Sequence, residues 1–139
     1  MGEDHRRLDA IFRQAARLAH AGSFADAVRR FEEFRCGLER HIEMEERVLF
    51  PAFERMTEMA GGPTAEMRVE HVEVRRLMDA VGTSLRAEDF AGLLEGVREL
   101  VTVLEGHNAK EENVLYPTVD RSVGSDRERE ELVQRMQRI

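Results

Sequence analysis

Two stretches of this chain repeat each other: HIEMEERVLFP at residues 41–51 and HNAKEENVLYP at residues 107–117. The same shift of 66 residues relates much of the chain, and it superposes these pairs of identical residues: His5 and His71, His41 and His107, Glu45 and Glu111, Pro51 and Pro117. Self-similarity at one fixed period predicts two structural units of one design. We therefore expect two helical hairpins, at about residues 4–58 and 70–124, joined at the Gly-Gly-Pro turn.

The segments between the turn-forming residues are rich in Ala, Leu, Glu, Arg and Met, which favour helix. We expect helices at about 4–21, 24–58, 64–86, 90–120 and 126–138, with N-caps at Ser23, Thr64, Asp89 and Ser125. Short connections make neighbouring helices antiparallel, so the expected fold is all-α. It is an up-down-up-down four-helix bundle over residues 1–124, with residues 125–139 as a short C-terminal helical extension of the same domain. Pro51 and Pro117 fall inside expected helices, which predicts a kink or a loosened turn at each.

Each of the four bundle helices carries one histidine on its apolar face at helical spacing. The four histidines lie at similar distances from the hairpin turns, so they are expected to meet in one layer of the core. The second and fourth helices each add a glutamate four residues after the histidine, on the same face. The predicted inward polar set is His5, His41, Glu45, His71, His107 and Glu111.

A metal site explains this set better than isolated core histidines do. Buried carboxylates cost several kcal/mol unless they are paired or bound to a metal, and neither stripe offers a lysine or arginine. Imidazole and carboxylate ligands without thiolate indicate iron, manganese or zinc. Six ligands are too many for one tetrahedral zinc, whereas two metals bridged by both carboxylates, each also held by two histidines, use all six. Such pairs in helical bundles are typically di-iron or di-manganese, and an open coordination position indicates small-ligand chemistry.

Four segments carry a resemblance to a known family: DHRRLD at 4–9, HIEMEERVLFP at 41–51, EHVEVRRL at 70–77 and HNAKEENVLYP at 107–117. Together they resemble the signature segments of the hemerythrin-like (HHE cation-binding) domain, in its branch with four histidines and two glutamates. The resemblance implies a four-helix bundle with a carboxylate-bridged centre of two iron ions, for which manganese or zinc are the substitutes. It implies terminal ligands His5, His41, His71 and His107, and bridging ligands Glu45 and Glu111.

Oxygen-carrying members of that family have a fifth histidine where this chain has Arg75, whose guanidinium stays protonated and cannot bind a metal. The resemblance therefore favours the branch that senses iron, repairs iron centres or handles oxygen, nitric oxide or peroxide. The repeat pairs Arg75 with Asp9, each four residues after a histidine. One hypothesis is that both lie over the metal site, in a salt bridge or in contact with a bound exogenous ligand. The alternative is that both reach solvent.

Three residues close to the predicted ligands in sequence are not interpreted as ligands themselves: Glu46, Glu112 and Tyr116. Glu46 and Glu112 follow the two inward glutamates. Two interpretations are open, partners of the ligand residues or helix-surface charges, and we favour the second. Tyr116 matches Phe50 in the repeat and is expected to project away from the ligand stripe into packing or a subunit contact. Apolar residues at helical spacing in 126–138 predict that the last helix packs on the bundle or on a partner.

Charge and composition restrict the partners and the location. A formal net charge of −7 argues against nucleic acid as the main partner. No signal peptide and no membrane-spanning run is expected, and the single cysteine, Cys36, fits a cytoplasmic protein. The functions left open are a binder or sensor of O2, NO or peroxide, a catalase-like or peroxidase-like enzyme, and an iron storage or donor module. A protein partner or a homodimer also stays open.

Overall fold

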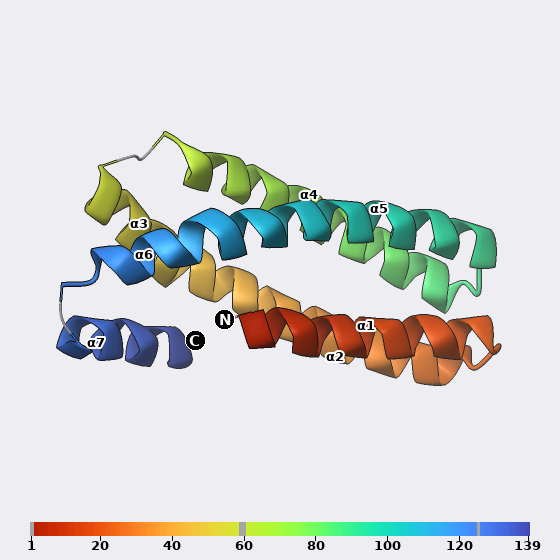
Figure 1. The fold of residues 1–139 in the computed structure, drawn as a ribbon. Coiled ribbons are helices and arrows are strands. Elements are labelled where there is room, and N and C mark those ends of the chain that lie inside the picture. The colour runs from red at the N-terminus through yellow and green to blue at the C-terminus, as the bar shows by residue number, and fades with distance from the viewer. Residues whose placement is uncertain (1, 59–60, 125) are drawn as a thin grey trace.

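The computed structural model describes residues 2–58, 61–124 and 126–139, and within these residues the regular structure is entirely helical. The helices, drawn in Figure 1, are α1 (Gly2–His20), α2 (Phe24–Met44), η1 (Glu45–Leu49), α3 (Phe50–Thr57), α4 (Pro63–Arg86), α5 (Phe90–Lys110), η2 (Glu111–Leu115), α6 (Tyr116–Ser122) and α7 (Asp126–Gln137). The segments η1 and η2 are single π-helical turns that join their neighbours without a break, so residues 24–57 and 90–122 each form one long helix. The predicted all-α fold is confirmed.

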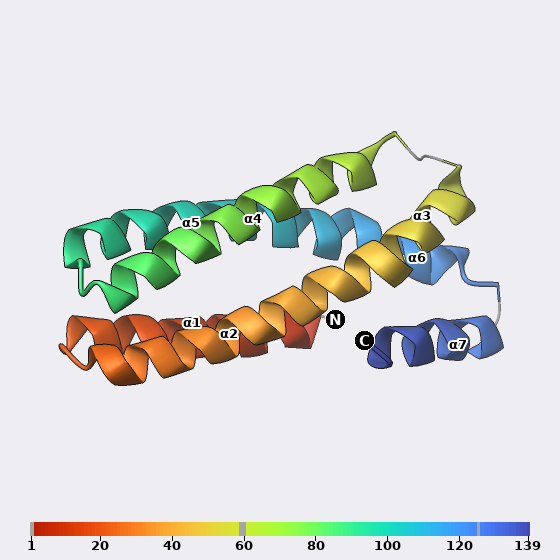
Figure 2. The same ribbon diagram turned by 180° about the vertical axis from the view of Figure 1, so that it is seen from behind.

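The helices form two antiparallel hairpins that pack face to face, as the repeat predicts. In Figures 1 and 2, α1 lies beside α2 and α4 beside α5, with α2 facing α4 on one side and α1 facing α5 on the other. Helices α1 and α4 are therefore diagonal to each other in an up-down-up-down bundle. The short α7 lies in line with α1, and the C-terminal end of α7 approaches the N-terminal end of α1 in both views.

The two π turns precede the two internal prolines. In η1 the amide of Phe50 donates to the carbonyl of Glu45, and in η2 the amide of Tyr116 donates to the carbonyl of Glu111. A proline one residue later has no N–H, and its ring clashes with the carbonyl four residues back in a regular helix. A wider turn relieves that clash, so the expectation of a loosened turn is confirmed, and each one begins at an inward glutamate.

The two hairpin turns have the same backbone conformation although their residues differ. Gly22 and Glu88, related by the repeat, both have left-handed backbones, with φ of 82° and 55°. In both turns the next amide reaches back across the helix end, from Ser23 to Leu18 at 2.8 Å and from Asp89 to Ser84 at 2.9 Å. This is the Schellman arrangement, in which glycine is favoured because it has no Cβ.

The four expected N-caps do not all occupy cap positions in the structure. Ser23 and Asp89 occupy cap positions, but only the Asp89 side chain makes a capping bond, from the Gly92 amide at 3.0 Å. Thr64 is not a cap, because α4 begins at Pro63, a residue favoured in the first helical turn. The Thr64 hydroxyl instead donates to Glu54 on α3 at 3.0 Å. Ser125 lies outside the described residues.

Two apolar clusters enclose the layer that contains the histidines. The larger cluster fills the bundle on the side of the hairpin turns, and it includes Phe31 and Leu100, both almost fully buried. The smaller cluster lies around α3 and α6 and is covered by Leu132 and Met136 of α7. The last helix therefore packs on the bundle. None of the described helices is long and apolar enough to cross a membrane.

The left-handed backbone of Glu88 makes a prediction about stability. Replacing Glu88 by Gly is expected to raise the free energy of unfolding by about 1 kcal/mol, because a non-glycine residue pays a steric penalty in this conformation. Urea unfolding followed by circular dichroism measures the change. The same substitution at Glu95, exposed within α5, is the matched control and should lower stability by about 1 kcal/mol. A loss of stability in both variants would contradict the prediction.

Candidate metal centre

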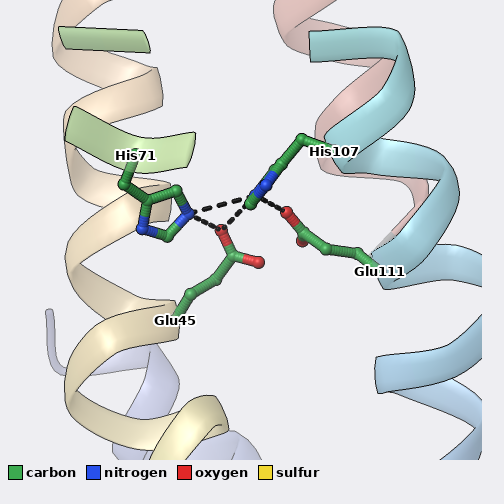
Figure 3. Close-up of side chains that lie close together, drawn as sticks. All are labelled: Glu45, His71, His107 and Glu111. Carbon is green, nitrogen blue, oxygen red and sulfur yellow. Dashed lines mark hydrogen bonds and ion pairs between the residues drawn. The ribbon is translucent and has the colours of Figure 1, made fainter. Parts of the chain in front are cut away.

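The six inward polar residues predicted from the sequence converge between the two hairpins. Glu45, His71 and Glu111 are completely buried, and the other three histidines are 3–8% exposed. Their ligand atoms form two groups, each with all atoms within 4.8 Å of one another: Glu45, His71, His107 and Glu111 in one, and His5, His41 and Glu111 in the other. Figure 3 shows the first group, with the four labelled side chains pointing at one another and Glu45 and Glu111 approaching from opposite sides.

The histidines are arranged as two pairs, one from each hairpin. In the first hairpin, Nε2 of His5 lies 3.1 Å from Nε2 of His41. In the second, Nε2 of His71 lies 3.0 Å from Nε2 of His107. The repeat relates the two pairs, and each pair directs its Nε2 atoms toward the carboxylates at the centre of the bundle.

Each of the four imidazoles also meets a carboxylate through its other nitrogen. An ionised carboxylate only accepts hydrogen bonds, so each Nδ1 donates a proton outward, and Nε2 is the nitrogen that faces inward and can coordinate a metal once it is deprotonated. The same pattern orients histidines that bind metals and raises their basicity. The pairs are His41 with Asp4 at 2.7 Å, His107 with Glu70 at 3.1 Å, His71 with Glu46 at 3.1 Å, and His5 with Glu112 at 3.3 Å.

These four carboxylates correct the sequence interpretation. Glu46 and Glu112 are not simple surface charges, because each accepts a hydrogen bond from a buried imidazole of the adjacent helix. Asp4 and Glu70 were not singled out at all. The signal was present in the sequence, since an acidic residue immediately precedes His5 and its repeat partner, and the 66-residue shift relates these two acids as well.

Each inward glutamate reaches both histidine pairs. Glu111 forms an ion pair with His107 on its own helix, and its Oε2 lies 3.4 Å from His5 Nε2 and 3.6 Å from His41 Nε2. Glu45 makes the symmetric set, with Oε1 at 3.6 Å from His41, 3.3 Å from His71 and 3.8 Å from His107. Each of the two carboxylates therefore contacts histidines of both hairpins.

The buried oxygens of these glutamates lack ordinary hydrogen bonds. Both oxygens of Glu45 and Oε1 of Glu111 have no hydrogen-bond partner among the described residues, despite the nearby imidazole nitrogens. Buried acceptors of this kind are rare and costly in native proteins. Four inward Nε2 atoms and unsatisfied carboxylate oxygens are the kinds of ligand atom that a cation needs, so the residues fit a metal site.

When no metal is bound, protons on the ligand residues supply the positive charge beside the buried carboxylates. Burial raises the pKa of Glu45, and the adjacent Glu111 raises it further. Burial also opposes ionisation of Glu111, but its contacts with Glu45 and with the imidazoles hold its pKa well below the usual range. Burial disfavours charge on His41 and His107, yet the neighbouring carboxylates outweigh it and raise both pKa values to about 10. The centre thus requires positive charge beside its carboxylates.

The expectation that Tyr116 projects away from the ligand stripe is wrong. Its hydroxyl donates to Glu111 Oε2 and lies 3.2 Å from His5 Nε2 and 3.3 Å from His41 Nε2. The cause is η2, because a π turn aligns residues five apart and so brings Tyr116 beside Glu111. Burial and the adjacent carboxylate raise the pKa of Tyr116, so the phenol stays protonated. The sequence prediction assumed a regular helical period through the proline.

The structure does not bring Asp9 and Arg75 together. They belong to the diagonal helices α1 and α4. Asp9 pairs with Arg13 one turn along α1, at the surface. Arg75 contacts Glu39 at 3.1 Å and Glu46 at 3.4 Å, so it supports the carboxylate that accepts from His71.

Comparison with known proteins agrees with this geometry. The family model described as the hemerythrin HHE cation-binding domain matches residues 1–119. The chain is 32% identical over 89 residues to the iron-sulfur cluster repair protein YtfE of Cronobacter sakazakii, a match covering 58% of this chain and 40% of that protein. The same-named proteins of Salmonella schwarzengrund and Yersinia pestis are 29% and 32% identical, with the same coverage.

The chain spans only about 40% of the length of these curated relatives. No solved structure matches it. The family match covers nearly all of the bundle, and it includes both histidine pairs and both inward glutamates. The chain therefore belongs to the hemerythrin HHE cation-binding domain family.

Proposed function

We propose that this chain is a non-haem di-iron protein that binds or reacts with O2, NO or peroxide. In this proposal His5 and His41 hold one iron, His71 and His107 hold the other, and Glu45 and Glu111 bridge them. The observation that carries it is the reach of each glutamate to histidines of both pairs. Two metals bridged by both carboxylates satisfy all six side chains, whereas a single ion leaves some of them unpaired.

The donor set supports iron among the metals considered. Imidazole and carboxylate without thiolate suit iron, manganese and zinc, and carboxylate-bridged pairs in helical bundles are typically iron or manganese. The cation-binding family and the name of the relatives, which refers to iron-sulfur cluster repair, favour iron. Such a pair supplies redox chemistry and a position open to a small ligand when it is bound.

The remaining residues of the centre prepare it for that role. The carboxylates of Asp4, Glu46, Glu70 and Glu112 fix the orientation of the imidazoles and direct their Nε2 atoms toward the place that a metal would occupy. The two apolar clusters exclude water above and below the layer. Asp9 lines a cavity that reaches His5, so a contact with an incoming ligand stays part of the proposal, while Arg75 acts on His71 through Glu46.

Two further functions could use the same centre. A catalase-like cycle would use the same open position for repeated turnover of peroxide. An iron donor or storage module agrees with the name of the relatives, although this chain covers less than half of their length.

Anaerobic reconstitution with iron(II) distinguishes these functions. We expect about two irons per chain, bound because they satisfy two histidine pairs and two carboxylates, and a spectral change on adding O2, NO or peroxide. Metal analysis and visible spectroscopy provide the measurements. Sustained peroxide turnover would assign the enzyme, and rapid loss of iron to a chelator would assign the donor. A chain that retains no metal would overturn all three.

Substitution of the bridging glutamates tests the shared centre. Glu45→Gln and Glu111→Gln are each expected to reduce bound iron from about two to about one per chain or fewer, because each carboxylate serves both histidine pairs. Elemental analysis of the reconstituted variants measures the loss. Glu95→Gln, at an exposed position on α5, is the control and should retain the full metal content. Full loading of both bridge variants would reject the bridging role.

Substitution of a carboxylate behind a histidine tests the orientation of the ligands. Glu70→Gln is expected to weaken iron binding about 10- to 100-fold, because it removes the charge that holds His107. Competition with a coloured chelator measures the affinity. Glu66→Gln is a matched control, since Glu66 contacts Lys110 at 2.7 Å as Glu70 does at 2.9 Å, but has no bond to a ligand histidine. Equal effects of both variants would assign the change to Lys110 instead.

A further inference from the structure

The two hairpins meet along two seams, which are joined in different ways. On the α2–α4 seam, ion pairs cross between the helices: Arg35 with Asp79, Arg75 with Glu39, and Arg86 with Glu32. The α1–α5 seam is joined at its two ends. At one end His5 donates to Glu112 at 3.3 Å, and at the other end the rings of His20 and Phe90 lie 6.0 Å apart. Between these two contacts the hairpins leave space.

A cavity of about 500 Å³ lies along the α1–α5 seam. Its floor consists of side chains of α1 and α2 that are at most 6% exposed: Leu8, Phe12, Phe34 and Leu38. Val97 and Val101 of α5 form the facing wall and are only partly buried. Sites that bind small organic molecules have such a volume and a mostly apolar lining.

The polar side chains of the cavity lie at its rim and toward the histidine layer. On α5 the lining changes along the helix from valines to polar residues: Glu105, Asn108 and Glu112. On α1 the exposed residues Arg6, Asp9 and Arg13 lie at the rim. The lining thus carries three carboxylates and two guanidinium groups. This balance of charge disfavours a bound anion.

The shape of the cavity suits an elongated occupant. Its lining on α1 runs from His5 to Ala16, which is about 16 Å along the helix. Apolar side chains follow this length, so an aliphatic chain can bury its surface against them. At the polar end, the partly buried amide of Asn108 can both donate to and accept from an uncharged head group.

We propose that the α1–α5 cavity binds an aliphatic molecule with one uncharged polar head group, of the class of a straight-chain alcohol. The chain lies between Phe12 and Val101, and the head group meets Asn108. The apolar part of this site extends away from the histidine layer toward the hairpin turns, and no metal takes part in it. Binding there is therefore independent of the proposed di-iron function.

Titration of the full chain with decanol, followed by isothermal calorimetry, tests this site. We expect saturable binding of one molecule per chain, with equal affinity in the metal-free and the iron-loaded protein. Affinity should rise about fourfold with each methylene from heptanol to decanol, because each added methylene is buried. Decanoate should bind more weakly than decanol, because carboxylates outnumber guanidinium groups in the lining.

Substitutions in the lining test the position of the chain and of the head group. Ala16→Phe is expected to weaken decanol binding about tenfold or more, because the ring fills the space that the chain needs. Ala10→Phe, at an exposed position of α1 outside the lining, is the matched control and should bind decanol as the native chain does. Asn108→Leu should weaken decanol about threefold to tenfold, because one hydrogen bond is lost.

A decanol analogue that carries a photoreactive diazirine locates the site on the native chain without any substitution. We expect cross-links, mapped by mass spectrometry, to residues 8–16 of α1, 34–38 of α2 and 97–108 of α5. Binding that does not saturate, tighter binding of decanoate, unchanged binding by Ala16→Phe, an equal loss in Ala10→Phe, or cross-links elsewhere would overturn the proposal. Failure to bind iron would instead reject the di-iron function and leave this site unaffected.

Discussion

Two carboxylates buried among four imidazoles are the constraint on which the rest of the structure depends. Glu45 and Glu111 are completely buried, and the described residues place no lysine or arginine against either one. A buried anion without a countercharge is unstable. The bundle surrounds these groups with Nε2 atoms, fixes each imidazole from behind with a further carboxylate, and seals the layer with apolar clusters on both sides. Each feature offsets the cost of keeping two carboxylates inside a small helical protein, where the imidazoles beside them supply positive charge.

Much of this arrangement could be predicted from the sequence, because the repeat and the helical period act together. The period placed one histidine of each helix inward, and the repeat placed all four at one height. The bundle and the convergence of the six polar residues followed from those two regularities alone. The hairpin turns also obey the repeat, down to the left-handed backbone shared by Gly22 and Glu88.

Two kinds of feature could not be predicted from the sequence: side-chain positions where the helical period changes, and contacts between helices. A π turn adds a residue to one turn, so a regular period places Tyr116 on the wrong face. The carboxylates behind the histidines belong to adjacent helices, and a helical wheel drawn for one helix does not show them. The hypothesis of a salt bridge between Asp9 and Arg75 is wrong for a related reason, because a repeat relates equivalent positions but does not make them neighbours.

Each hairpin places its glutamate against the histidine pair of the other hairpin, and this arrangement has an evolutionary consequence. Each hairpin contributes a histidine pair and a glutamate that reaches the opposite pair, which is the geometry of a symmetric dimer of identical hairpins. In such an ancestor every substitution would appear twice, once on each side of the axis. Joining the two copies in one chain removes that restriction. One side now carries a tyrosine at position 116 while the other keeps a phenylalanine at position 50, so only one half of the layer has a hydroxyl beside its histidine pair.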